Sequence, residues 1–168
     1  GVFYEEEYHG FSGKYHYVYR NKRWVSLTQA PFSIKAAFVY DNLIYIIDSS
    51  ENYSIWNSTT DTWSTSTAIG VNFNYITKSN NAFYMLDTTT YILYQWLGDG
   101  TTPTQVDTLS SSVSGIMQWC NNALYIVHQT NRNHDDRVME LYKWTVENGI
   151  EKVKDLPTDC QHFISAGN

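Results

Sequence analysis

Three stretches of the chain decide the fold, and they read Asn42-Leu43-Ile44-Tyr45-Ile46-Ile47, Asn81-Ala82-Phe83-Tyr84-Met85-Leu86 and Asn122-Ala123-Leu124-Tyr125-Ile126-Val127. Each begins in a turn that contains Asn and continues as a short apolar run with Tyr at a fixed place. The chain opens with Gly1-Val2-Phe3-Tyr4, which looks like the same run without its turn. With the aromatic residue as the marker, starting at Phe3, the repeats step by 42, 39 and 41 residues. A period of this size is typical of stacked or circular repeat arrays.

The repeats are built from short runs of β-forming residues separated by Asn, Asp, Gly and Thr, and no stretch has the apolar spacing and caps of a helix. In the second repeat we expect strands at 33–40, 43–48, 53–56 and 62–67. Four antiparallel strands in about 40 residues are the blade of a β-propeller. We therefore predict an all-β protein, a β-propeller of four-stranded antiparallel blades, with about four blades in this chain. The recurring Tyr45, Tyr84 and Tyr125 are expected in the core between blades.

The blades are expected to form a single domain over residues 1–168. We place them at 161–168 together with 1–30, then 31–70, 71–110 and 111–160. The first repeat shows three outer strands, at 2–7, 14–19 and 23–28, so we expect residues 161–165 to supply its innermost strand and close the ring. Three arrangements stay open: a closed four-bladed ring, a segment of a longer propeller completed by its parent chain, and two chains that self-associate by sharing strands.

The segment from Ile46 to Ser64 resembles a kelch repeat, with an apolar strand, a Tyr-containing strand, a polar turn and then Trp63; Trp24 takes that last place in the first repeat. The third and fourth repeats, with Trp96 before Gly98-Asp99-Gly100-Thr101 and with Glu140-Leu141-Tyr142-Lys143-Trp144, resemble the Glu-Leu-Trp-x-x-Asp-Gly-Thr type of propeller repeat. The paired glycines of kelch repeats are absent. The resemblance therefore implies a propeller and no inherited partner or activity.

The composition narrows the class of partner. The formal net charge is −6, and no run of Lys or Arg is long enough for a phosphate-binding face, so nucleic acid is not expected as a partner. No apolar stretch approaches the roughly 18 residues of a membrane span. Two glycosylation sequons begin at Asn52 and Asn57, and together they favour a secreted or extracellular glycoprotein.

The loop after the second strand of each repeat is taken as the functional face, because loops carry binding residues on a rigid scaffold. We expect four polar residues at this place, Glu6, Asp48, Asp87 and His128, where the kelch glycines would stand. They could form a ring of ligands for a polar group. The alternative is that each of them caps its own strand by bonding to neighbouring backbone.

Two longer loops add further candidates for binding. Residues 129–137 hold His134, Asp135 and Asp136, and residues 5–13 hold His9. Neighbouring residues rarely point at one ion, so no metal and no cofactor are predicted, and no catalytic residue is assigned. Cys120 and Cys160 lie about 20 Å apart in the expected register, at about 3.3 Å per residue, which is too far for a disulfide.

These observations predict a non-catalytic binding or scaffolding module that engages a protein or a glycan through its loop face. The alternative is a propeller enzyme, glycosidase-like or metal-dependent, with its site on the same face.

Overall fold

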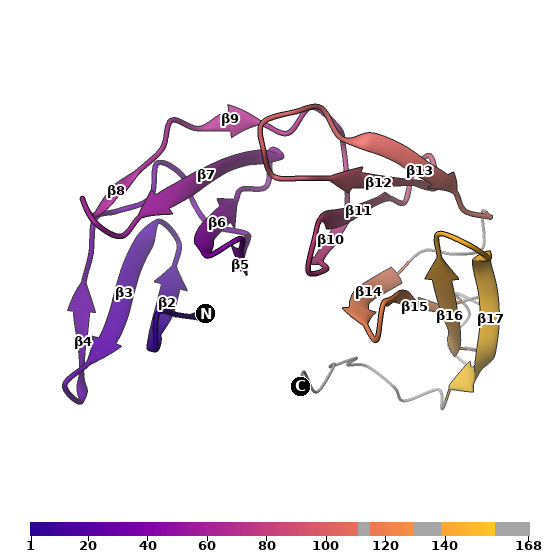
Figure 1. Cartoon of the computed structure of the whole chain (residues 1–168), viewed down its shortest axis with the longest axis horizontal. Helices are drawn as coiled ribbons and strands as arrows, with labels where there is room; N and C mark the ends of the chain where they lie inside the picture. Colours follow the sequence, from indigo (N-terminus) through magenta and orange to yellow (C-terminus); the bar gives the residue numbers. More distant parts are fainter. Residues whose placement is uncertain (111–114, 130–138, 157–168) are drawn as a thin grey trace. The chain divides into compact units, whose positions relative to one another are not determined.

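The structure is a computed structural model, and it describes residues 1–110, 115–129 and 139–156. Every regular element in these residues is a β-strand. Among the described residues there is no helix long and apolar enough to cross a membrane. The chain divides into two compact units, Gly1–Val71 and Asn72–Asn168. Each unit contains two antiparallel sheets, which we number as the first to fourth blade (Figure 1).

The first unit holds the first and second blades. The first blade has strand order β1-β2-β3-β4, from β1 (Val2–Tyr4), β2 (Glu7–Ser12), β3 (Tyr15–Arg20) and β4 (Arg23–Ser26). The second has order β5-β6-β7-β8, from β5 (Ala36–Tyr40), β6 (Leu43–Ile47), β7 (Asn52–Asn57) and β8 (Thr62–Trp63), and β9 (Thr67–Ala68) also pairs with β7.

The second unit holds the third and fourth blades. The third has order β10-β11-β12-β13, from β10 (Tyr75–Lys78), β11 (Phe83–Asp87), β12 (Ile92–Trp96) and β13 (Thr104–Thr108). The fourth has order β14-β15-β16-β17, from β14 (Gly115–Cys120), β15 (Ala123–Gln129), β16 (Met139–Thr145) and β17 (Gly149–Leu156). The all-β class and the four-stranded blades are therefore confirmed.

Tight turns join the first and second strands of three blades. Two consecutive residues have φ between 45° and 65° in each turn, at Glu5-Glu6, Asp41-Asn42 and Asn121-Asn122. Two positive φ angles in a two-residue loop are the signature of a type I′ turn, whose twist matches that of the flanking strands. Asn and Asp adopt this conformation with little strain, so the sequence marks the second and fourth blades clearly.

Of the three strands expected in the first repeat, those at 14–19 and 23–28 correspond to β3 and β4, and the one at 2–7 is wrong. Residues 2–7 do not form one strand, because the Glu5-Glu6 turn ends β1 at Tyr4 and begins β2 at Glu7. All four strands of the first blade come from Val2–Ser26, so that sheet has its innermost strand without residues 161–165. Those residues lie outside the part of the chain that the structure describes.

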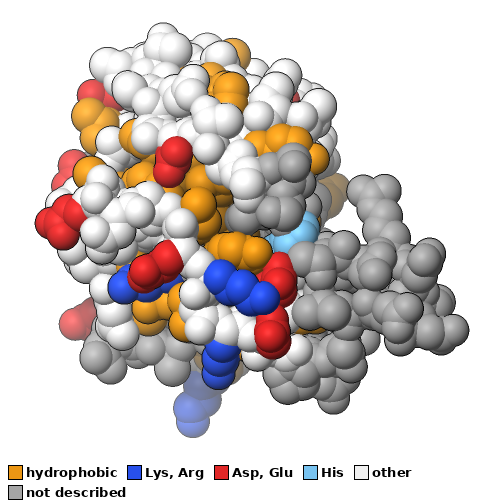
Figure 2. Space-filling view, turned by 90° about the vertical axis from the view of Figure 1, so that its right-hand side faces the viewer, with side chains coloured by type: hydrophobic (Ala, Val, Ile, Leu, Met, Phe, Trp, Pro, Cys, Tyr) orange, Lys and Arg blue, Asp and Glu red, His pale blue; other side chains and the backbone are white. Residues whose placement is uncertain are grey.

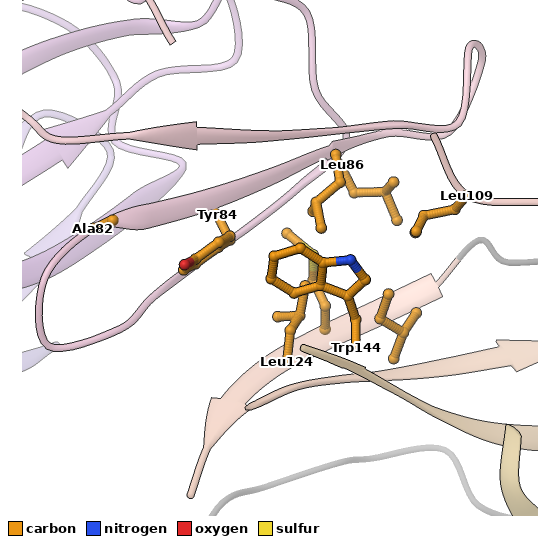
Figure 3. Close-up of a cluster of buried hydrophobic side chains, with 9 residues drawn as sticks. Ala82, Tyr84, Leu86, Leu109, Leu124 and Trp144 are labelled. Atoms are coloured by element: carbon orange, nitrogen blue, oxygen red, sulfur yellow. The ribbon is translucent and has the colours of Figure 1, made fainter. Parts of the chain in front are cut away.

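The core of each unit lies between its two blades. In the first unit, Ile44, Ile46 and Trp56 of the second blade pack with Tyr4 of the first. In the second unit, Leu124, Ile126 and Trp144 of the fourth blade pack against three residues of the third blade, Tyr84, Leu86 and Leu93 (Figure 3). Tyr84 stacks on Trp119 with ring centroids 4.8 Å apart, which confirms that this repeated Tyr lies between blades.

The outer strands of the fourth blade carry charges of both signs side by side, as Figure 2 shows from the side of β17. Lys152 bonds to Glu140 and to Asp155, and Lys143 lies 3.6 Å from Glu151. Because these Lys side chains are paired with carboxylates, within β17 and between β16 and β17, they make a mixed surface and not a basic one.

Candidate ligand-binding site

A pocket of about 600 Å³ lies in the first unit, where the first blade meets the second. The turns that join first and second strands supply Glu5 and Asn42, and the end of β7 supplies Asn57. The remaining lining residues are Tyr4, Leu43, Ile55, Trp56, Ser58, Thr59, Thr62, Trp63 and Ser64. This combination gives aromatic walls and a rim of amides, hydroxyls and one carboxylate, which is the usual make-up of a ligand site.

The carboxylate of the pocket is held in place. The Tyr4 hydroxyl donates a hydrogen bond of 3.0 Å to Glu5 Oε1, and Glu5 itself sits in the type I′ turn with φ 45°. Tyr4 is only 5% exposed and meets Trp56 edge-on at 6.0 Å, so its ring cannot swing away without opening the core. Both the backbone and the side chain of Glu5 are thus positioned at the pocket by the fold.

Asp61 fixes the other side of the pocket. Its carboxylate accepts hydrogen bonds from the Trp56 indole at 3.1 Å and from the backbone N–H and hydroxyl of Thr28 in the first blade. The Trp63 indole in turn donates to the Thr28 carbonyl at 3.0 Å. These bonds join the two blades through polar groups and hold the two Trp rings that line the pocket.

A pair of buried histidines lies behind the pocket. His9 Nδ1 and His16 Nε2 are 2.9 Å apart, both side chains are almost fully buried, and His16 Nδ1 has no hydrogen-bond partner. The His16 ring is 4.9 Å from Trp56 and 5.3 Å from Trp63. Burial, followed by the proximity of His9, lowers the pKa of His16 to about 4, and burial also lowers the pKa of His9. Both rings are therefore neutral at pH 7.

Two of the residues predicted for binding lie elsewhere than expected. Glu6 belongs to the turn between the first and second strands, at the opposite end of the blade from the loop that holds Asp48 in the second blade. Its expected equivalence to Asp48 is therefore wrong, and the register places Ser12 there. His9 is not in a loop but inside β2, where it is buried and takes the position of Tyr45.

Asp48 and Asp87 do occupy matching positions at the end of the second strand, one in each unit: Asp48 follows β6 directly and Asp87 is the last residue of β11. Asp48 accepts hydrogen bonds from the backbone N–H groups of Ser50 and Asn52, and Asp87 accepts from those of Thr89 and Thr90. Burial acts to raise the pKa of each carboxyl, but these bonds outweigh it and lower the pKa of both. Each carboxylate thus organises its own turn, as the strand-capping alternative expected.

The other predicted residues fall into two groups. His128 lies inside β15, not in the loop after it, and is buried beside Tyr142 at 6.3 Å. His134, Asp135, Asp136 and Cys160 lie outside the described residues, so the predicted absence of a Cys120–Cys160 bond stays a prediction. Within residues 1–110, 115–129 and 139–156, no three acidic, His or Cys side chains gather as metal ligands would.

The two sequons differ in the exposure and the hydrogen bonds of their Asn side chains. Asn52 Nδ2 donates to Asp48 Oδ2 at 3.0 Å, and the side chain is half-buried in β7. Asn57 is exposed at the end of β7, and it is its carbonyl oxygen that accepts bonds, from the backbone of Thr59 and Thr60. Asn57 is therefore the exposed member of the pair, and the bonds of its side chain to Thr59 and Thr60 do not use the amide nitrogen.

The pocket was not among the residues predicted from sequence. Tyr4 ends β1, Glu5 lies in the turn after it, and Trp63 lies in β8 of the second blade. The pocket is at the opposite end of the strands from the loops that the sequence favours. One sequence feature does indicate the pocket: Trp56 and Trp63 flank a polar turn. In the sequence analysis these residues serve only to identify the repeat.

Comparison with known proteins supports the fold and gives no family. No protein-family model and no curated protein matches the chain. Among solved structures, the WD40 domain of Toxoplasma gondii coronin aligns with a TM-score of 0.56 and 10% identity, over 92% of this chain and 44% of that one. The N-terminal domain of Nup159 aligns with a TM-score of 0.54 and 12% identity, over 87% and 47%. YCF48 bound to D1 peptide aligns with a TM-score of 0.51 and 12% identity, over 93% and 56%. The chain therefore has the β-propeller fold, and it spans about half of the length of these solved propellers.

Proposed function

We propose that the chain is a non-catalytic binding module, and that its pocket in the first unit receives a Lys or Arg side chain from a protein partner. The observation that carries the proposal is the Glu5 carboxylate, held by the Tyr4 hydroxyl in a pocket whose walls include Trp56 and Trp63. No Lys or Arg is among the residues that line this pocket.

The chemistry of the walls suits a cation. A carboxylate at the rim attracts a basic head group, and partly exposed aromatic rings such as Trp63 stabilise a cation over their faces by about 0.5–2 kcal/mol. The aliphatic stem of Lys or Arg packs on apolar surface while its charge stays at the rim. The net charge of −6 would also speed the approach of a basic partner.

The fold agrees with a binding role, since a propeller presents turns on a rigid scaffold. One of the similar propellers, YCF48, was solved with a bound peptide, which supports a peptide as the class of ligand to test first. We also propose an extracellular location, because two sequons lie in the first unit.

A glycan is the second candidate ligand. Trp63 is only partly buried, and Thr59, Thr62 and Ser64 place hydroxyl groups around the pocket. Hydroxyl groups beside an aromatic face suit a neutral sugar, which would have little need of Glu5.

The test is binding of a library of short peptides in which Lys or Arg alternates with neutral residues, measured by fluorescence anisotropy at two salt concentrations. The key variant is Glu5→Gln, and the matched control is Glu6→Gln, because Glu6 lies in the same turn but does not line the pocket. We expect Glu5→Gln to weaken binding about tenfold, as loss of a charged hydrogen-bond partner does, and Glu6→Gln to change it little.

Equal effects of the two variants would mean that only net charge matters, and would contradict the pocket. A glycan array gives the other arm of the test. Binding of neutral sugars that is insensitive to Glu5→Gln, with no peptide binding, would replace the protein partner by a glycan.

A further inference from the structure

One face of the first blade is covered by no other element of the first unit. The strand register puts six aromatic side chains on this face, Phe3, Tyr8, Tyr15, Tyr17, Tyr19 and Trp24, and we call it the aromatic face. Phe3 is 67% exposed and Trp24 is 53% exposed, and Tyr8, Tyr15 and Tyr19 are each more than two-fifths exposed. A contiguous apolar surface of this kind marks an interaction site in a soluble protein.

The aromatic face is ordered by its own contacts. A methyl group added to Gly10 would come within 3.0 Å of the Trp24 ring, so the indole lies against the backbone of β2. Tyr8 and Tyr19 flank this indole, with ring centroids 5.9 Å and 5.3 Å from it in edge-on geometry. Because the rings fix one another, little side-chain freedom is lost when a partner packs on them.

The same positions in other blades are interfaces. Tyr8, Tyr19 and Trp24 correspond in register to Ile44, Trp56 and Trp63 of the second blade, and Ile44 and Trp56 are buried against the first blade. In the fourth blade, the matching Leu124 and Trp144 are buried against the third. The aromatic face thus matches faces on which blades dock, and the second blade, the other sheet of the first unit, packs on the opposite face.

The charge pattern indicates what can cover it. The other strand positions on this face hold Gly10, Ser12 and Ser26, so no strand position on it has a charged side chain, although the chain as a whole has a net charge of −6. Two copies that meet through this face would therefore bring no like charges into contact.

The available area is sufficient for a dimer. A large aromatic side chain buries roughly 200 Å², and about half of each of the five most exposed rings is accessible. That gives about 500 Å² per chain and about 1,000 Å² for a pair, which is the lower bound of specific interfaces. Two sheet faces can pack in this way at about 10 Å.

We propose that the aromatic face docks on the same face of a second copy of this chain, in a symmetric dimer. The interface is isologous, with Tyr19 and Trp24 of each copy near its centre, and the modest area gives a dimer that dissociates on dilution.

The experiment is sedimentation-velocity analysis of the 168-residue chain over a dilution series. We expect a monomer–dimer equilibrium that Tyr19→Glu shifts to monomer, with a dissociation constant raised at least tenfold. The matched control is Leu97→Ser, which changes a half-exposed apolar residue in the other unit and should leave the equilibrium unchanged. Far-ultraviolet circular dichroism shows whether each variant is folded.

A charge-swap experiment keeps the proposal testable even if single variants are less stable. In a symmetric interface, Tyr19→Glu and Tyr19→Lys chains should each be monomeric alone and should form a mixed dimer when combined. A monomer at every concentration, a dimer unaffected by Tyr19→Glu, or monomeric chains that bind insoluble polysaccharide through Trp24 would each overturn the proposal. None of these outcomes depends on Glu5 or the pocket, so the two proposals fail separately.

Discussion

The indole Nε1 of Trp144 donates a 2.6 Å hydrogen bond to Asp107 Oδ2, and this bond joins the third strand of the fourth blade to the outermost strand of the third. Trp144 is 2% exposed, so its N–H has no access to water. In the first unit the buried indole N–H finds its acceptor within the same blade, because Trp56 donates to Asp61. Asp61 in turn accepts a hydrogen bond from Thr28, which follows the last strand of the first blade. In both units a carboxylate joins a buried Trp to the neighbouring blade.

The first prediction concerns this bond in the second unit. Asp107→Ala leaves the buried indole N–H of Trp144 without its acceptor, and we expect it to lower the free energy of unfolding by about 1–3 kcal/mol. Asp107→Asn retains an acceptor and should cost less. Chemical denaturation followed by Trp fluorescence measures both. Asp155→Ala removes a carboxylate in an exposed ion pair and serves as the control, with an expected change within about 0.5 kcal/mol.

The second prediction is an acid sensitivity that arises from His16. Its pKa is about 4 in the folded chain and 6.5 when unperturbed, so folding favours the neutral ring. The stability contributed by the neutral ring is fully present above pH 6.5 and is lost as the pH falls from 6.5 toward 4. The shift corresponds to at most about 3 kcal/mol. The Asp61 carboxylate opposes part of this shift, because it acts to raise the pKa of His16. At the neighbouring His9, Glu7 acts to raise the pKa and Arg20 acts to lower it.

His16→Phe tests this, because Phe can stack on Phe11 as His16 does and does not titrate. We expect unfolding midpoints of the parent chain to fall between pH 6.5 and 4.5 and those of the variant to fall less. The difference between the two profiles isolates the imidazole, because both chains carry the same carboxylates. Parallel profiles would show that His16 does not control the acid response.

The third prediction separates a structural role of Asp87 from a ligand-binding one. Asp87→Ala removes the acceptor for the backbone of Thr89 and Thr90 and for the Thr90 hydroxyl, and we expect a loss of about 1–2 kcal/mol of stability. Asp87→Asn keeps the side-chain oxygen that accepts the backbone bonds and should lose less than half of that. If both variants were as stable as the parent chain, the turn would not depend on Asp87. That result would favour the alternative that Asp87 is one of a ring of ligands for a polar group.

The second, third and fourth blades were predictable because their turns and strands carry local signals. Asp41-Asn42 and Asn121-Asn122 favour the left-handed conformation that a type I′ turn needs, and alternating apolar runs follow them. The first blade failed at Glu5-Glu6, which adopts the same turn although Glu has no preference for it. Because this turn separates β1 from β2, the observed strands begin and end at other residues than expected. His9 consequently takes the position of the repeated Tyr, which the sequence pattern does not reveal.

The candidate pocket could not be predicted in the same way. Its residues come from turns and strands of two blades that are far apart in sequence. The packing of Tyr4 on Trp56 and the bonds of Asp61 and Trp63 to Thr28 bring Glu5 to Trp63. A single sequence reports the strand alternation of each blade but not which turn of one blade faces which turn of the next. The buried histidine pair was likewise hidden, since a His in a strand reads as polar until its neighbours are known.

The fourth prediction concerns which sequon is used when the chain is secreted from eukaryotic cells. Glycosylation at Asn52 would require Nδ2 to leave Asp48, whereas the amide nitrogen of the exposed Asn57 makes no such bond. We expect glycopeptide mass spectrometry to find a glycan on Asn57 and none on Asn52. Asn57→Gln should abolish the mass shift and Asn52→Gln should retain it.

A glycan on Asn52 would mean that the bond to Asp48 forms after modification or not at all, and no glycan on either site would remove the main support for an extracellular location. Because Asn57 also lines the pocket, the same glycan would narrow the entrance that a basic side chain must pass, and binding measured with and without it would show how much of that entrance the ligand needs.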